Sequence, residues 1–324
     1  MSHDPRVLLQ KADKALSGAS SGWSLFGGRQ EKYENAIDLY KEAGNAFRAQ
    51  DMDKEAGMAY EKAASIEETK VEEPLDAANT LQDAFKAYGK TSPEDAARVL
   101  QKAIGFYLLK NPRRAATQLQ SLAKHYEELM GDEQQAMDAY QRAAKLFEKD
   151  NAQALANKNW QKVGELGALS ADYPSAIDAF IRVASDPNGP YPGHYTQMFF
   201  NAILCMFAEM DLPGVRNALE KYQDPGRYPH FAGSNECRFL SHMYDILSTP
   251  TEDQAKLFHG LVDGAQGRGS KETRSQFPVM LAPFNDWRQI MITRVYRKIP
   301  DSPAAPAPGA SATTTAEDVE EDFS

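Results

Sequence analysis

The chain has 324 residues, of which 42% are hydrophobic and 25% charged. This length and composition allow one large or two ordinary domains with a sizeable core and a soluble surface. The 46 acidic and 36 basic residues give a net charge of −10, which argues against nucleic acid as the main partner, because phosphate binding needs a basic surface.

The first residues, MSHDPRVLLQKADK, carry charges where a secretory signal has an apolar core. No apolar run approaches the roughly 18 residues of a membrane-spanning helix. We therefore expect a cytosolic chain. Its two cysteines, Cys205 and Cys237, lack Cys-x-x-Cys spacing, so we expect free thiols rather than a disulfide framework.

After a short first helix, the sequence from Ala15 to Gly28 has no charge. We expect a loop over residues 17–28, in which Trp23, Leu25 and Phe26 stand among glycine and small polar residues. One interpretation is a loop that folds back on the first helix pair. The other is an exposed apolar tip for a membrane or a partner.

From residue 36 onward, a small residue is followed by a large one at i+4 and a small or branched one at i+7, with a period of about twenty residues. These positions share one helical face, on which small residues let helices approach closely. The pattern occurs as Ala36-Tyr40-Ala43, Ala56-Tyr60-Ala63, Ala77-Leu81-Ala84, Ala96-Leu100-Ala103, Ala136-Tyr140-Ala143, Ala156-Trp160-Val163 and Ala176-Phe180-Val183, with one imperfect copy at Ala115-Leu119-Leu122.

Helix breakers fall between these copies, at Gly89 to Pro93, Asn111-Pro112, Gly131-Asp132 and Asp172 to Pro174. The sequence therefore predicts an all-α fold: a tetratricopeptide-like solenoid over residues 1–185 with about forty residues per helix pair. A non-repeating helical bundle is the alternative.

Residues 186–299 lose the period, and we expect a globular helical bundle there. A proline-rich loop opens it, and 264–277 reads as a mobile polar loop. Helical patterns cover Tyr195–Met210, Leu212–Gln223, Ser234–Leu247, Thr251–Asp263 and Asn285–Ile299.

Residues 300–324 are rich in Pro, Ala and Thr and end in EDVEEDFS. Their composition predicts a disordered tail. One interpretation is that the acidic tail only increases solubility. The second interpretation is that it is a docking element, because Phe323 is an aromatic residue at the penultimate position.

No catalytic or metal-binding motif is apparent: the histidines lack ligand spacing, and phosphate loops, dinucleotide loops and nucleophile elbows are absent. Carboxylate pairs such as Glu67-Glu68 are interpreted as solvated surface, and Cys205 as an inert buried thiol. We therefore expect no enzyme, no metal and no cofactor.

Basic residues gather in the middle of the predicted solenoid, although randomly placed surface cations explain each of them equally well: Arg113, Arg114, Lys124, Lys158 and Lys162.

Taken together, these features resemble the alpha-type soluble NSF-attachment proteins, the adaptors of SNARE disassembly. The resemblance rests on Leu25-Phe26-Gly27-Gly28, Ala156-Asn157-Lys158, Phe199-Phe200-x-Ala-x-Leu-Cys205, Glu236-Cys237, Asp286-Trp287 and the acidic ending with a large apolar penultimate residue.

The resemblance implies a peripheral membrane adaptor that binds the assembled SNARE four-helix complex, several copies per bundle, and recruits and stimulates the hexameric AAA ATPase NSF. It implies that Lys158 and Lys162 face the SNARE bundle, with Arg113, Arg114 and Lys124 as nearby candidates. It also implies membrane contact by Trp23, Leu25 and Phe26, and ATPase binding by Asp245, Glu252, Asp253, Glu321, Asp322 and Phe323.

The chain departs from the family where relatives have further basic residues, since it has Thr117, Thr196 and Asn235. Phe323 also replaces the usual leucine, after a Pro/Ala/Thr insertion. The rival interpretation is a general tetratricopeptide-like scaffold that captures another peptide.

Overall fold

The computed structural model describes residues 4–21, 28–186, 189 and 193–300. Over these residues it has sixteen α-helices, two π-helical turns and no strand. The chain divides into two compact units, Met1–Met198 and Phe199–Ser324. This division falls inside helix α10 (Tyr195–Glu209).

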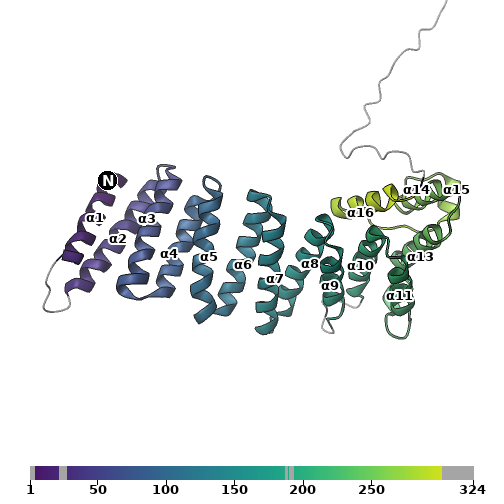
Figure 1. The fold of residues 1–324 in the computed structure, drawn as a ribbon, viewed down its shortest axis with the longest axis horizontal. Coiled ribbons are helices and arrows are strands. Elements are labelled where there is room, and N and C mark those ends of the chain that lie inside the picture. Colours follow the sequence, from purple (N-terminus) through teal and green to yellow (C-terminus); the bar gives the residue numbers. More distant parts are fainter. Residues whose placement is uncertain (1–3, 22–27, 187–188, 190–192, 301–324) are drawn as a thin grey trace, which may run out of the picture. The chain divides into compact units, whose positions relative to one another are not determined.

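Unit 1 is a row of antiparallel helices in which each helix packs against the next one in the chain (Figure 1). The helices are α1 (Pro5–Ser21), α2 (Gly28–Arg48), α3 (Asp53–Ile66), α4 (Pro74–Tyr88), α5 (Pro93–Lys110), α6 (Pro112–His125), α7 (Glu133–Lys149), α8 (Gln153–Leu169) and α9 (Tyr173–Ala184). The predicted all-α, solenoid-type architecture is confirmed.

The repeated motif forms the core of this row. The first residue of every copy is fully buried: Ala36, Ala56, Ala77, Ala96, Ala115, Ala136, Ala156 and Ala176 are each 0% exposed. The large residues at i+4 are also buried, Trp160 at 1% and Phe180 at 0%. Small residues let neighbouring helices approach, and the large side chains at i+4 fill the grooves between them.

The predicted breakers lie at helix ends, and several of them start the next helix. Pro93 and Pro112 occupy the first turns of α5 and α6, where a missing N–H costs nothing. Asn111 and Asp132 cap α6 and α7, since their side-chain oxygens accept hydrogen bonds from the backbone N–H of Arg114 and Gln135, each at 3.0 Å.

Two π-helical turns extend α3 and α6: η1 (Glu67–Val71) and η2 (Tyr126–Met130). The interpretation of Glu67 as solvated surface is wrong, because its side chain is buried and Oε1 lies 2.6 Å from Nζ of Lys41.

The loop expected over 17–28 starts later than predicted. α1 continues to Ser21, with Ala19 buried and the hydroxyl of Ser17 donating to the carbonyl of Lys14.

Unit 2 contains α11 (Leu212–Tyr222), α12 (Pro229–Ala232), α13 (Asn235–Ser248), α14 (Gln254–Ala265), α15 (Lys271–Gln276) and α16 (Asp286–Arg297) around most of α10. The five predicted helices are confirmed. Two polar contacts fix α16 to α10: the guanidinium of Arg288 donates to Asn201, and the ammonium of Lys298 donates to the carbonyl of Ala208.

Both thiols are free, as predicted, and both are buried, although burial was predicted only for Cys205. Burial raises the pKa of Cys205 to about 12, which keeps the thiol protonated and inert at neutral pH. The segment 264–277, expected to be a loop throughout, contains the short helix α15, and its last residue, Phe277, is 7% exposed. No helix in the described part of the chain is long and apolar enough to cross a bilayer.

Candidate functional site

Three of the five predicted SNARE-binding cations meet on unit 1. Lys124 comes from the end of α6, and Lys158 and Lys162 come from consecutive turns of α8. They line a shallow hollow of about 240 Å³, which we call the lysine hollow; its remaining lining residues are Gln120, Tyr140, Gln161 and Glu165. The helices that supply the lysines are separated in sequence by α7, so only the packed row brings them together.

Lys162 is held in place by acidic neighbours. Its Nζ lies 2.8 Å from Oε1 of Glu127 and 3.9 Å from Oε2 of Glu165. Partial burial lowers the pKa of Lys162, but the hydrogen bond and the charges of these carboxylates raise it more, so the net pKa lies above its ordinary value. Lys162 is therefore a fixed cation at neutral pH.

The carboxylate of Glu127 also accepts a hydrogen bond from the hydroxyl of Tyr140, which is 1% exposed, at 2.8 Å. Burial and the negative charge of Glu127 raise the pKa of Tyr140 far above its ordinary value, so this phenol stays neutral and donates. Glu127 belongs to η2. The π-helical turn thus supplies the anchor that ties Lys162 to the buried core.

Lys158 and Lys124 differ from Lys162 because both are exposed and neither makes an ion pair within the described residues. Lys158 lies one turn before Lys162 on the same face of α8. The lysine hollow thus presents two open cations beside one anchored cation. Such an arrangement attracts an acidic surface, and open charges act on encounter rate and register more than on affinity.

The two predicted arginines lie at the opposite end of α6. Arg113 forms an ion pair with Asp150 at 3.3 Å, and the guanidinium of Arg114 stacks 4.5 Å from the ring centre of Tyr107. Arg114 precedes Lys124 by ten residues, or about 15 Å along the helix. The structure therefore does not bring the arginines into the lysine hollow.

Helical spacing could have found part of the lysine hollow, since Gln120 lies one turn before Lys124 on α6. Thr117 is exposed and its hydroxyl donates to the carbonyl of Arg113; it lies on the same face of α6 but does not line the hollow. Gln161 and Glu165 are likewise one turn apart on α8. No sequence signal indicated that Glu127 would reach Lys162, because that contact spans 35 residues.

The other two departures from the family lie elsewhere. The amide of Asn235 donates to the carbonyl of Met280 at 2.9 Å, within unit 2. Thr196 lies in the first turn of α10, and its hydroxyl oxygen is buried with no hydrogen-bond partner among the described residues. Neither residue lines the lysine hollow.

A second group of candidates lies at the connection between α13 and α14. Asp245, Glu252 and Asp253 are exposed and form no ion pair within the described residues. The buried side chain of Gln254 donates to the carbonyls of Ile246 and Leu247 at 2.7 and 3.4 Å. This contact fixes the start of α14 to the end of α13, so the three carboxylates form an acidic connection of defined shape.

Six predicted contact residues lie outside the described part of the chain: Trp23, Leu25, Phe26, Glu321, Asp322 and Phe323.

Comparisons with known proteins identify relatives of this chain. The chain is 41% identical over 261 residues to a Neurospora crassa protein named "probable vesicular-fusion protein sec17 homolog", covering 80% of this chain and 88% of that protein. It is 37% identical to the Schizosaccharomyces pombe protein of the same name, covering 75% of this chain and 84% of that one.

Identity to the human "alpha-soluble NSF attachment protein" is 30%, over 74% of this chain and 81% of that one. A family model described as "Soluble NSF attachment protein, SNAP" matches residues 3–259. The chain therefore belongs to the soluble NSF attachment protein family, whose members are adaptors rather than enzymes.

Proposed function

We propose that this protein is a peripheral adaptor in vesicle fusion that binds assembled SNARE four-helix complexes and recruits the AAA ATPase NSF to take them apart. The observation that carries the SNARE part is the lysine hollow, where Lys124, Lys158 and Lys162 converge from α6 and α8. A four-helix SNARE bundle with an acidic surface is a partner of complementary charge.

The acidic connection of unit 2 supports the ATPase part of the proposal. Asp245, Glu252 and Asp253 are exposed and held together through Gln254, so they offer a negative surface to the basic domain of a partner. The acidic segment Glu317 to Phe323 adds a second contact for the same ATPase. Two weak contacts on one chain bind the same partner more tightly than either contact alone, because the first contact raises the effective concentration of the second.

The segment that contains Trp23, Leu25 and Phe26 would provide the membrane contact. Burying each such side chain in a bilayer yields roughly 1.5–3 kcal/mol. One copy therefore binds lipid weakly and reversibly, whereas several copies around one SNARE bundle would hold the assembly at the membrane.

A reconstituted disassembly assay tests the proposal. Assembled SNARE complexes carrying a fluorophore and a quencher on different helices are mixed with NSF and ATP, with and without the full chain. We expect dequenching only when the chain, the ATPase and ATP are all present. Disassembly at the same rate without the chain would contradict the adaptor role.

A binding measurement separates this function from a general peptide scaffold. The chain should bind the assembled four-helix complex in preference to any single SNARE segment, because its cations are spaced along a rigid surface. Equal affinity for a single extended segment would favour the scaffold.

A further inference from the structure

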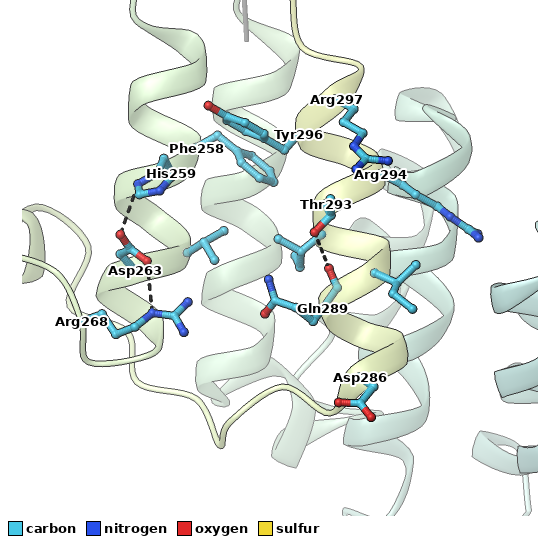
Figure 2. A pocket seen from close by; sticks show the side chains of 13 residues that line it. Phe258, His259, Asp263, Arg268, Asp286, Gln289, Thr293, Arg294, Tyr296 and Arg297 are labelled. Atoms are coloured by element: carbon cyan, nitrogen blue, oxygen red, sulfur yellow. Dashed lines mark hydrogen bonds and ion pairs between the residues drawn. The ribbon is translucent and has the colours of Figure 1, made fainter. Parts of the chain in front are cut away.

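A cavity in the described part of unit 2 lies between α14 and α16, where none of the predicted contact residues is found. It is a groove of about 620 Å³, a volume typical of ligand sites. Figure 2 shows its lining side chains, which come from both helices and from Arg268 beyond the end of α14. The family match ends at residue 259, so most of the groove lies beyond it.

The floor of this groove is apolar. Phe258 and Val262 of α14 and Ile292 of α16 are buried, and Tyr296 stacks on Phe258 with ring centres 6.1 Å apart. Ile290 also lines the groove and is 37% exposed, one of only two large hydrophobic side chains exposed in the described part of unit 2. The groove therefore leaves apolar surface uncovered.

Charges are distributed unevenly around the groove. Beside α14, Asp263 is neutralised by Arg268 at 3.3 Å and lies 3.2 Å from His259. Along α16, Asp286 occupies the first turn, whereas Arg294 and Arg297 occupy the last, at the opposite end of the helix in Figure 2. Arg297 is exposed and has no ion pair within the described residues. One end of the groove is therefore basic beside an apolar floor.

One segment of the same chain has the complementary composition. Residues 317–323 read Glu-Asp-Val-Glu-Glu-Asp-Phe. Val319 and Phe323 are the apolar residues of this segment, and the other five residues are acidic. This segment follows α16 by about twenty residues, which can span up to about 70 Å, whereas the twelve residues of α16 are about 18 Å long. The segment can thus reach any part of the groove.

We propose that the groove between α14 and α16 binds residues 317–323 of the same chain, with Phe323 on the apolar floor and the carboxylates beside Arg294 and Arg297. The covalent link raises the local concentration of the segment to about the millimolar range, so even a weak site is occupied. In this state Phe323 is withheld from other partners, and the groove controls when the acidic segment is available.

Cysteine cross-linking in the full chain tests this proposal without SNAREs or ATPase, so its outcome is independent of the proposed function. The native thiols, Cys205 and Cys237, are buried and do not compete. Gln289→Cys places a thiol on an exposed lining residue, and Ser324→Cys places the other beside an intact Phe323. Disulfide yield after mild oxidation with oxidised glutathione is measured by mass spectrometry.

We expect Phe323→Ser and, separately, Arg297→Glu to lower the yield of the 289–324 disulfide by about fivefold, a modest change for losing one anchor or one charge contact. The length of the link is the same in all these variants, so random encounters cannot cause the difference. Lys256→Cys on exposed α14 surface outside the groove is the matched control, and its yield with Ser324→Cys should not respond to Phe323→Ser.

The proposal would be overturned by equal disulfide yields for the 289–324 and 256–324 pairs. It would also be overturned if neither Phe323→Ser nor Arg297→Glu changed the yield of the 289–324 disulfide. A disulfide that joins two chains would also overturn it, and would assign the groove to a second copy.

Discussion

The ammonium of Lys162 lies 2.8 Å from a carboxylate oxygen of Glu127, and the other oxygen of that carboxylate accepts a hydrogen bond from the buried hydroxyl of Tyr140. A π-helical turn at the end of α6 thereby fixes a cation of α8. Lys158, one turn away, has no such anchor. The lysine hollow thus contains one anchored cation, Lys162, and open cations such as Lys158. Substitutions at the anchor should change stability, whereas substitutions of the lysines should change partner binding.

Reversing both charges on α8, with Lys158→Glu and Lys162→Glu, should weaken binding to assembled SNARE complexes. We expect a loss of about tenfold or more near physiological salt, and a smaller difference from the native chain at high salt, because exposed charges are screened. Titration by fluorescence anisotropy at two salt concentrations measures both. Lys54→Glu, an exposed lysine of α3 far along the row from α8, is the control; unchanged affinity of the α8 variant would remove these lysines from the contact.

Removing the anchor should cost stability. Glu127→Ala leaves the buried hydroxyl of Tyr140 without its acceptor, and we expect a loss of about 1–3 kcal/mol in the free energy of unfolding. Urea denaturation measures this change. The double variant Glu127→Ala with Tyr140→Phe should recover part of the loss, because no buried hydroxyl is then left unpaired. Identical stabilities for the two variants would mean that the hydrogen bond is not the cause.

The apolar residues before α2 should matter only where there is a membrane. With Trp23, Leu25 and Phe26 all changed to Ser, we expect disassembly of SNARE complexes on liposomes to fall several-fold, since each lost contact removes roughly 1.5–3 kcal/mol of lipid binding. Rates in detergent should stay close to those of the native chain. Comparable losses in both settings would favour the fold-back interpretation of this segment.

Deleting Phe323 and Ser324 should lower stimulation of the ATPase and leave SNARE binding intact. The reason is that Phe323 is the large apolar group of the acidic segment, and burial of one such side chain contributes roughly 1.5–3 kcal/mol. ATP turnover by NSF and anisotropy with labelled SNAREs give the two readouts. Stimulation at the native level would leave the acidic tail as a solubilising segment only.

Close helix packing in unit 1 gives a test that involves no partner. A Cβ at Gly164 would lie 2.6 Å from the ring of the buried Phe180, so Gly164→Ala should destabilise unit 1 by about 1–3 kcal/mol. At Gly105, also helical, an added Cβ meets nothing within 4 Å. Gly105→Ala should therefore stabilise the protein by about 0.5–1 kcal/mol. Thermal unfolding should show a lower melting temperature for Gly164→Ala and a higher one for Gly105→Ala.

Much of unit 1 could be predicted because its information is local. Ala156, Trp160 and Val163 lie within two turns of one helix, and their spacing alone predicts which face of the helix is buried. Asn111-Pro112 marks a helix start for equally local reasons. The same logic fails at 17–21, where an uncharged run rich in Ser and Gly is typical of a loop but forms the end of α1, in which Ala19 is buried.

By itself, the amino-acid sequence determined the helical row, the positions of its turns, the five main helices of unit 2 and the pair of cations on α8. Only the tertiary structure decided that Lys124 joins that pair while Arg113 and Arg114 do not, that Glu127 anchors Lys162, and that an uncovered groove runs between α14 and α16. The physical reason is that a helical repeat fixes which side chains share a face. Which faces meet depends instead on packing between helices whose residues are tens of positions apart.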